Sequence, residues 1–411
     1  MMTSYVIFIE SNTSGTGPLF FEAARNLGYA PILLARDITR YAFLDVTDIR
    51  VISCDTSDIG SLLKVCRNLA SQGRIAGIMT SSDYFVEAVA RLTGLLNLPG
   101  PPLSAVKTCR NKAALRRALQ QAHLEVLRFF ECNQLDEVDQ AVQHVGLPAV
   151  VKPIAGSGSV NVSLCLSTQE VRTRTAQIMA AQASEGVLIE QYVSGPEYSV
   201  ELFNGRSMGI TRKHLGNLPF FVETGHDFPA ILTAEAEADI TRHVEKICQT
   251  VGIDWGPAHV ELKLDISSSP QIIEINPRLA GGFIPEIMRL ACGVNVIEEF
   301  VRLSTGGIPL IEATKERHAS IRFIIPDRDG TLYRIEGISE ARSRPHIMDI
   351  QFYGSCPNEI VLQGNFRDRI GHVIAAADRG EDAAAAAQSA LSIVSQSYLT
   401  SNGQRVGGAR S

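Results

Sequence analysis

The sequence predicts an α/β protein of several domains. Three observations support this prediction: a length of 411 residues, an alternation of short apolar strands with helical patterns near the start, and a proline-rich break near residue 100. At roughly 150 residues per domain, the length corresponds to two to four domains. Strands that alternate with helices are typical of a parallel sheet covered by helices.

Composition narrows the class of protein without indicating an activity. The 38 Lys and Arg residues against 44 Asp and Glu residues give a net charge of −6, so the overall charge favours neither nucleic acid nor a membrane as a partner. A hydrophobic content of 45% is that of a folded globular protein. The first residues, MMTSYVIFIESN, lack the basic region and the long apolar run of a signal peptide. We therefore expect a cytoplasmic protein.

The first hundred residues have the strand and helix order of a parallel α/β domain. Strands are expected over 5–9, 32–34 and 75–79, and helices over 18–27 and 83–92. The loop after the first strand contains Gly15 and Gly17, but Phe20 stands where a dinucleotide-binding loop would have its third glycine. A glycine turn that opens a helix is therefore the favoured interpretation. The segment LPGPP over 98–102 cannot continue a helix and marks a boundary near residue 100.

The rest of the chain mixes strands and helices. A helix is expected over 110–122, and residues 148–193 have the pattern strand, glycine loop, strand, helix and strand. Further strands are expected over 258–266, 271–276, 319–325 and 347–353, and helices over 285–302 and 382–397. Residues 400–411, rich in Gly, Ser and Arg, are expected to form a flexible tail. The eight cysteines are scattered, without the short spacing of a zinc site.

A strand that ends in a lysine precedes a loop of small residues. The sequence is VVKPIAGSGS over 150–159, with the lysine at position 152, and residues 155–159 are called the glycine-serine loop below. Small residues let backbone N–H groups approach an anion closely, and Lys152 adds a positive charge, as polyphosphate binding requires. The order differs from that of a Walker A loop, because the lysine precedes the glycines. A surface hairpin with a solvated lysine is the alternative.

A stronger signal comes from two neighbouring strands, HVELKLDI over 259–266 and QIIEINPR over 271–278. Alternation gives each strand one apolar face, which is formed by Val260, Leu262, Leu264, Ile266, Ile273 and Ile275. The opposite, polar face carries Glu261, Lys263, Glu274 and Asn276. An antiparallel hairpin with a two-residue loop at 267–268 places Glu261 opposite Glu274, and any register that keeps the apolar faces together leaves both carboxylates on one side.

Two carboxylates that face each other across a hairpin destabilise it unless a cation lies between them. The oxygens of Glu261, Glu274 and Asn276 are ligands that Mg²⁺ accepts, with phosphate and water completing its coordination shell. A solvated hairpin face is an equally valid interpretation of these residues alone. Arg278 and the flexible turn at 279–282 suit a second anion, such as a carboxylate or an acyl phosphate.

Four motifs in a fixed order resemble a known superfamily. They are a lysine at a helix start (Lys112), VKP followed by the glycine-serine loop, IEQYVSGPEYSVE over 189–201, and EINPR over 274–278. In this order and at these distances they resemble the ATP-grasp superfamily of carboxylate-amine ligases. The segments ETGHDFP over 223–229 and NPRLAGG over 276–282 are similar to the L-amino acid ligases, the dipeptide synthetases that include the ligase of dapdiamide biosynthesis.

The resemblance implies an ATP-grasp fold in the α/β class. The expected parts are a Rossmann-like N-terminal domain over 1–105, a small α+β lid domain over 106–195, and a C-terminal α+β catalytic domain over 196–399 with an appended subdomain from about 310, before the tail over 400–411. The resemblance also implies ATP and Mg²⁺ as cofactors, with Mn²⁺ as an alternative metal. Amino acid and amine substrates follow from it, and a homodimer is compatible with it.

Roles for individual residues follow from the same resemblance. ATP would be bound by Lys112, Lys152, Ser157, Gly158, Ser159, Glu190, Gln191, Tyr192, Val193 and Glu197. Mg²⁺ would be held by Glu261, Glu274 and Asn276. Lys152 and Arg278 would be catalytic, because they would neutralise charge on the phosphates and on the acyl phosphate. The substrate would be bound by Glu223, His226, Arg278, Gly281 and Gly282.

The implied reaction begins with a carboxylate that attacks the γ-phosphate of ATP, which gives an acyl phosphate and ADP; an amine then displaces phosphate. The product would be a dipeptide or another amide, in a natural-product pathway. One alternative is another ATP-grasp reaction, of the carboxylase or purine-pathway type, and a second is a nucleotide-binding regulator without turnover. The sequence leaves open whether His226 acts as a base or is an ordinary hydrogen-bonded residue, and whether Lys213 is only surface charge.

Overall fold

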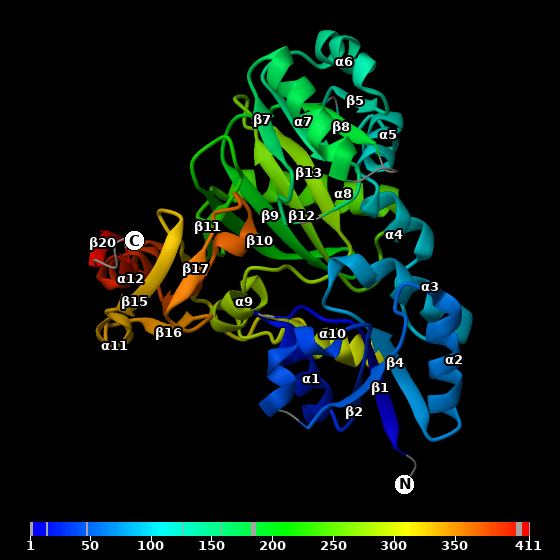
Figure 1. Cartoon of the computed structure of the whole chain (residues 1–411). Coiled ribbons are helices and arrows are strands. Elements are labelled where there is room, and N and C mark those ends of the chain that lie inside the picture. The colour runs from blue at the N-terminus through cyan, green and yellow to red at the C-terminus, as the bar shows by residue number, and fades with distance from the viewer. Residues whose placement is uncertain are drawn as a thin grey trace.

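The computed structural model describes the chain over residues 3–13, 15–46, 48–125, 127–156, 158–181 and 186–399, and the backbone over 405–410. Figure 1 shows an N-terminal unit at the bottom, a small central unit at the top, and a large sheet between them that continues into the C-terminal region. None of the helices in these ranges is both long enough and apolar enough to cross a bilayer.

The N-terminal unit is a parallel sheet, as the sequence predicts, and it has four strands where the sequence indicated three. In sheet order, its strands are β3 (Arg50–Ser53), β2 (Ala30–Ala35), β1 (Ser4–Ile9) and β4 (Arg74–Met79). The helices that pack on it are α1 (Gly17–Asn26), α2 (Ile59–Ala70) and α3 (Val86–Leu96). The sequence did not predict β3 and α2, since β3 is a short edge strand with no buried residue to give it an apolar pattern.

Helix α10 (Val296–Ser304) returns from the large sheet to the N-terminal unit, where Phe300 joins the hydrophobic core beneath β1 and α1. Figure 1 shows α10 beside α1. The predicted single helix over 285–302 is wrong. Helix α9 (Ile284–Cys292) ends at Gly293, whose φ of 80° lies in the left-handed region that favours glycine.

The central unit is a four-stranded antiparallel sheet with two helices on one face. In sheet order, the strands are β5 (Phe129–Cys132), β8 (Val187–Gln191), β6 (Ala149–Pro153) and β7 (Ser163–Cys165). The helices are α6 (Val138–Val145) and α7 (Thr168–Ala181). The strand, loop, strand, helix and strand order predicted over 148–193 is confirmed. Helices α4 (Leu103–Arg110) and α5 (Lys112–Gln121) join this unit to the first.

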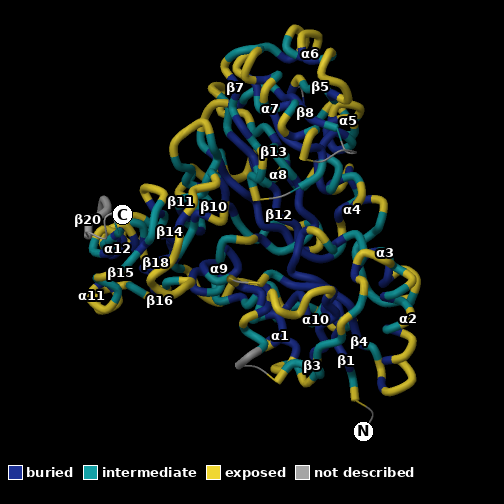
Figure 2. Tube along the Cα trace, in the orientation of Figure 1, coloured by how far each residue is buried: buried dark blue, intermediate teal, exposed yellow. Residues whose placement is uncertain are grey.

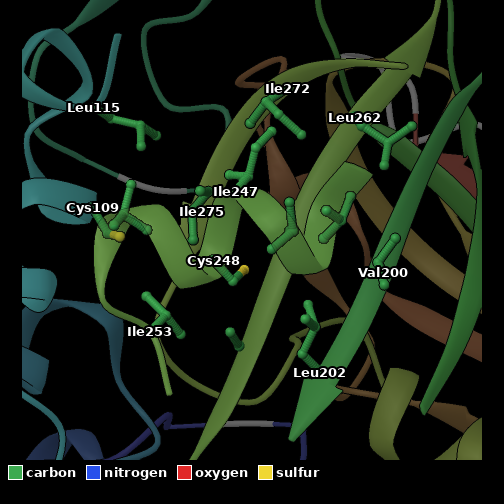
Figure 3. Close-up of a cluster of buried hydrophobic side chains, with 14 of the residues drawn as sticks. Cys109, Leu115, Val200, Leu202, Ile247, Cys248, Ile253, Leu262, Ile272 and Ile275 are labelled. Atoms are coloured by element: carbon green, nitrogen blue, oxygen red, sulfur yellow. The ribbon is translucent and has the colours of Figure 1, made fainter. Parts of the chain in front are cut away.

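The large sheet has eight strands and carries the main core of the molecule. In sheet order, they are β13 (Pro270–Asn276), β12 (Pro257–Leu264), β9 (Glu197–Phe203), β10 (Arg206–Leu215), β11 (Glu223–Phe228), β14 (His318–Ile324), β18 (Gly371–Ala377) and β16 (Ile347–Phe352). Helix α8 (Ala234–Val251) packs on β9, β12 and β13, where Figure 3 shows Ile247 among Val200, Leu262 and Ile275. Because β11 pairs with β14, the region after residue 310 extends the sheet that precedes it.

The remaining C-terminal elements are a small antiparallel sheet and two helices that pack on β14, β16 and β18 of the large sheet. Its strands are β17 (Asn358–Ile360), β15 (Gly330–Glu336), β19 (Ser395–Leu399) and β20 (Arg405–Arg410), and the helices are α11 (Ile338–Arg342) and α12 (Gly380–Ile393). The predicted helix over 382–397 is too long, because Val394 is extended and Ser395 starts a strand. Strand β20 lies within the segment that the sequence predicts as a flexible tail.

Short 3₁₀ turns complete the elements: η1 (Ile38–Arg40), η2 (Ala42–Val46), η3 (Asp83–Phe85), η4 (Leu135–Glu137) and η5 (Phe366–Asp368). Figure 2 shows that the strands of the N-terminal and large sheets are mostly buried, whereas outer helices such as α2 and α6 carry much of the exposed surface. Two of the turns, η3 and η5, lie next to the site described below.

The core position of Leu262 and the exposed position of Ile266 give a first prediction. The sequence places both on one apolar face, but Leu262 is 0% exposed and Ile266 is 100% exposed. Leu262→Ala should lower the free energy of unfolding by about 2–5 kcal/mol, because it leaves a cavity in the core. Ile266→Ala is the control and should change it by less than about 0.5 kcal/mol. Urea unfolding measures both, and equal effects would contradict the placement of Leu262.

Candidate active site

The hairpin of β12 and β13 confirms that Glu261 lies directly opposite Glu274. Its loop spans 265–269, so the predicted two-residue loop is wrong. A β-bulge beside Glu261 shifts the register by one residue and restores the predicted pairing of the two carboxylates. The bulge also places Ile272 in the core and leaves Ile273 on the polar side, so the predicted inward position of Ile273 is wrong.

A cleft of about 790 Å³ lies between the central unit and the large sheet. It brings together most of the residues predicted to bind ATP and metal: Lys112, Lys152, Ser159, Glu190, Gln191, Tyr192, Val193, Glu197, Glu261 and Glu274. A concave site with a few convergent charged groups is typical of small-molecule binding. Gly158, Asn276 and the residues predicted to bind the amino acid do not line it, and Ser157 lies outside the described residues.

Two buried lysines stand at one end of the cleft, each paired with a carboxylate. Lys112 at the start of α5 has its Nζ 2.8 Å from Glu274 Oε1, and Lys152 on β6 has its Nζ 2.6 Å from Glu190 Oε2. Burial lowers the pKa of Lys152, although Glu190 raises it. Burial also raises the pKa of Glu190, but Arg116 and Lys152 outweigh this and lower it to about 2. Both lysines therefore have a charged partner already in place.

Arg116 ties the central unit to the large sheet. It is 1% exposed, and its Nε lies 2.7 Å from Glu190 Oε1 while its Nη1 lies 2.7 Å from Glu125 Oε2. The same Nη1 donates a hydrogen bond to the carbonyl oxygen of Ile272 on β13 at 2.7 Å. The sequence does not identify Arg116 as a site residue, because an arginine in a helix is usually exposed. Its spacing of four residues from Lys112 was the available signal, since it places both cations on one helix face.

The glycine-serine loop covers the cleft and contacts the C-terminal region. Its backbone lies in the left-handed region at Gly156 (φ 137°) and Gly158 (φ 68°), which glycine adopts without a steric penalty. The carbonyl oxygen of Gly156 accepts a hydrogen bond from Lys112 Nζ at 3.0 Å. A Cβ added to Gly158 would lie 2.6 Å from the ring of Phe366, so the loop packs directly against η5.

The residues predicted to hold Mg²⁺ fit a hard cation. Asn276 is 2% exposed, and its Oδ1 has no hydrogen-bond partner among the described residues. By strand alternation it lies on the same face as Glu274, which is opposite Glu261. A buried unpaired oxygen beside two carboxylates is a donor set that Mg²⁺ accepts. In the described ranges, no group of three or more His, Cys, Asp and Glu is arranged to hold a metal, so a cation here depends on Asn276 and on phosphate or water.

Lys213 of β10 occupies the middle of the polar face. Its side chain is 1% exposed, so the alternative that it is only surface charge is wrong. Its Nζ lies 2.7 Å from Glu223, 3.1 Å from Glu261 and 3.2 Å from Glu197. Burial lowers the pKa of Lys213, but the three carboxylates outweigh it and raise that pKa well above its ordinary value. Lys213 therefore links the cleft to the segment at 223–229.

His226 is buried beside the turn at 279–282. Both ring nitrogens lack a hydrogen-bond partner within the described chain, and the 3.7 Å from Nε2 to Glu223 Oε2 is too long for one. A Cβ added to Gly282 would lie 2.6 Å from Nε2, while one added to Gly281 would meet open space. Burial lowers the pKa of His226 to about 3, so the ring is neutral at pH 7 and is a poor base there.

Arg278 lies at the junction of the large sheet and the N-terminal unit. Its Nε lies 2.7 Å from Asp83 Oδ1, its Nη2 pairs with the other oxygen of Asp83, and its Nη1 donates to the carbonyl oxygen of Leu279 at 2.8 Å. Asp83 belongs to η3, after the carboxyl end of β4. Ligands of parallel sheets bind at this end of the strands. Nothing in the sequence identifies Asp83 as the partner of Arg278.

Two further residues line the cleft without having been predicted as ligands. Lys263 Nζ lies 5.1 Å from the centre of the Tyr192 ring and 5.3 Å from that of Phe221, which is cation–π geometry. Strand alternation places Lys263 on the polar face with Glu261 and could have identified it. No sequence signal marks Phe221.

The neutral state of His226 gives a prediction about pH. Below pH 6.5 the unfolded chain binds a proton at this histidine and the folded chain does not, so this group lowers the free energy of unfolding as the pH falls from 6.5 toward 3. A His226→Gln variant has no titrating side chain at this position, so it lacks this decrease in the free energy of unfolding. Between pH 7 and pH 5 the wild type should lose about 2 kcal/mol more stability than the variant. Urea unfolding of both proteins at the two pH values measures this, and a constant difference would contradict the buried neutral ring.

The sequence matches three domain families. Residues 21–100 match the ATP-grasp N-terminal domain, 145–286 the ATP-grasp domain and 322–397 the L-amino acid ligase C-terminal domain 2. The uncharacterized protein y4rH of Sinorhizobium fredii is 35% identical over 92% of this chain and 79% of its own length. Carnosine synthase 1 of Gallus gallus is 28% identical over 62% of this chain, and the match spans only 31% of that protein.

The fold is similar to that of solved structures. The L-amino acid ligase from Bacillus licheniformis superposes with a TM-score of 0.82 at 24% identity, and the match covers 97% of this chain and 100% of that one. This likeness confirms the predicted ATP-grasp fold. The domain families and the sequence relatives agree with it. The chain belongs to the ATP-grasp superfamily of ATP-dependent carboxylate-amine ligases, and it shares a C-terminal domain with the L-amino acid ligases.

Proposed function

We propose that the protein joins the carboxylate of an amino acid, or of a related acid, to an amine, and that it converts ATP to ADP and phosphate. The product is a dipeptide or a related amide. One observation carries this proposal: the cleft places two buried lysines beside a facing pair of carboxylates, with the unpaired oxygen of Asn276 on the same strand face. Anionic phosphates and a divalent cation together match this set of charges.

The nucleotide is proposed to bind along β6 and β8. Lys112 and Lys152 would contact its phosphates, and the glycine-serine loop would cover them. The side chain of Glu190 is held by Arg116 and Lys152, so it is not free to bind the adenine, which is proposed to contact the backbone of residues 190–193. Glu197, 8% exposed in the wall of the cleft, is proposed to contact the ribose.

Glu261, Glu274 and Asn276 are proposed to hold Mg²⁺, which when bound neutralises charge on the phosphates. The chain's own residues act on the rest of the reaction. Lys152 keeps positive charge beside the γ-phosphate, and Arg278 is proposed to stabilise the acyl phosphate. The glycine-serine loop excludes water, which would otherwise hydrolyse that intermediate. Glu223, His226, Gly281 and Gly282 are proposed to bind the amino acid.

The proposed reaction has two steps. A carboxylate oxygen bonds to the γ-phosphorus while the bond from that phosphorus to the β,γ-bridging oxygen breaks, which gives an acyl phosphate and ADP. The amine nitrogen then bonds to the acyl carbon, the bond from that carbon to the phosphate oxygen breaks, and the released phosphate takes up the proton that the nitrogen loses. Each step transfers negative charge to a phosphate, where the lysines can stabilise it.

The alternatives are less well supported. A carboxylase or purine-pathway ligase would not account for the match of residues 322–397 to the L-amino acid ligases. A regulator without turnover would not need the facing carboxylates that the hairpin preserves at Glu261 and Glu274. A natural-product pathway, a cytoplasmic location and a homodimer stay predictions from the sequence.

Incubation with ATP, Mg²⁺ and pooled amino acids tests the function. The wild type should form ADP and phosphate only when amino acids are present, and a product of dipeptide mass should appear. Glu274→Ala should lower this rate by a factor on the order of 100 or more, because it removes a carboxylate from the proposed metal site.

Glu237→Ala, which removes an exposed carboxylate from α8, is the matched control and should leave the rate unchanged. Formation of AMP in place of ADP would contradict the acyl-phosphate mechanism. A near-normal rate for Glu274→Ala would contradict the proposed metal site.

A further inference from the structure

We propose that Arg369, in the C-terminal region, binds the carboxylate of the acceptor, so that the accepted amines are amino acids with a free carboxylate and not simple amines. This inference rests on the proposed ligase function and deepens it. It gives residues 363–369, for which the sequence suggested no role, a part in acceptor selection.

Arg369 contacts both segments that are proposed to bind the amino acid. Its Nη1 lies 2.9 Å from Glu223 Oε2 at the start of β11. The same nitrogen is 3.5 Å from the position that a Cβ on Gly282 would occupy. Its guanidinium lies over the ring of Phe323, 4.5 Å from the ring centre, in the geometry of a cation–π contact. The side chain is 13% exposed, so it is mostly enclosed but still open to a ligand.

Three cations lie at this end of the site, and they differ in the donors that they have left. Lys213 is shared by three carboxylates, and all three nitrogens of Arg278 already donate to Asp83 or Leu279. Arg369 uses Nη1 for Glu223 and Nε for the carbonyl oxygen of Phe366 at 3.2 Å. Its Nη2 has no hydrogen-bond partner in the described part of the chain. Nη2 and the second N–H of Nη1 can therefore donate two parallel hydrogen bonds to a carboxylate.

The turn before Arg369 is held in one conformation. The carboxylate of Asp368 accepts hydrogen bonds from the backbone N–H groups of Gln363 at 2.8 Å, Gly364 at 2.7 Å and Asn365 at 3.3 Å. A guanidinium that follows such a turn loses little conformational freedom when a ligand binds. The backbone that carries Arg369 is thus held by hydrogen bonds within the turn.

The same turn also reaches the phosphate end of the site. Phe366, which lies three residues before Arg369 in the chain, packs against Gly158 of the glycine-serine loop. Arg369 itself contacts Glu223. An acceptor held by Arg369 would therefore lie close to the cover of the γ-phosphate. This is where the amine must be in order to attack the acyl phosphate.

A purely structural role, in which Arg369 only neutralises Glu223, makes a different prediction. In that case its removal would affect all acceptors equally, because the damage would be to the site as a whole. If Arg369 instead binds the acceptor carboxylate, its removal would affect only acceptors that have a carboxylate. Amino acids and their matching amides separate the two cases, since they differ in that group alone.

The test uses the full-length protein with the twenty amino acids and the matching amino acid amides as acceptors, and it measures kcat/KM from product mass. The wild type should prefer acids to amides. Arg369→Gln should lower kcat/KM for acids by a factor on the order of 100 and leave that for amides within about threefold. Arg369→Lys should restore part of the loss, because it keeps the charge without the planar edge. Thermal unfolding confirms that each variant is folded.

Arg367→Gln is the matched control, because Arg367 is exposed on the same turn, and it should keep the wild-type preference. An equal loss for acids and amides, or a wild type without a preference for acids, would overturn the inference. The proposed function has its own readout, ADP formation that depends on a carboxylic acid. If the wild type forms no ADP in response to a carboxylic acid, both the function and the inference are overturned. If it forms ADP but does not prefer acids to amides as acceptors, the inference alone is overturned.

Discussion

The placement of the two walls of the cleft depends on the buried guanidinium of Arg116. It contacts Glu125, Glu190 on β8 and the carbonyl oxygen of Ile272 on β13, so one side chain joins the central unit to the large sheet. Removing such a cation and two carboxylates from water costs several kcal/mol each, and only complete pairing offsets this. An arrangement in which the two units were displaced would leave buried charges unpaired. The ion pairs and hydrogen bond of Arg116 therefore hold the two walls of the cleft in one arrangement.

The alternation of side chains along β12 and β13 predicted which face of the hairpin carries the candidate site residues. The apolar faces of β12 and β13 had to lie together, and this placed Glu261 and Glu274 on one side of the hairpin. Their direct pairing was predicted from a two-residue loop, which is wrong, and it is kept because the bulge compensates for the longer loop. No pattern in the sequence predicts the bulge at Ile273, because the bulge depends on how the hairpin packs against α5 and the hydrophobic core. Contacts between residues far apart in the sequence could not be predicted either. Arg116 and Ile272 are 156 residues apart in the sequence, and Arg369 is 146 residues from Glu223. Local patterns predict which face a residue occupies but not which distant element meets it.

Positive and negative charges are closely matched throughout the site. Lys112 has Glu274, Lys152 has Glu190, and Lys213 has three carboxylates. Buried pairs of this kind prevent either partner from remaining as an isolated charge, which would be costly in a protein interior. A polyanion that enters such a site must exchange partners with residues that are already paired. Binding of phosphates and of a cation at the same time keeps the charges matched, whereas either one alone would not.

The contact between Gly158 and Phe366 links two segments that belong to different domain families in this chain. The space that a side chain would fill at Gly158 is taken by the ring of Phe366. A larger residue at position 158 would therefore require the ring of Phe366 to move. A designed exchange of the C-terminal region with that of a related enzyme would have to keep this contact compatible with the glycine-serine loop.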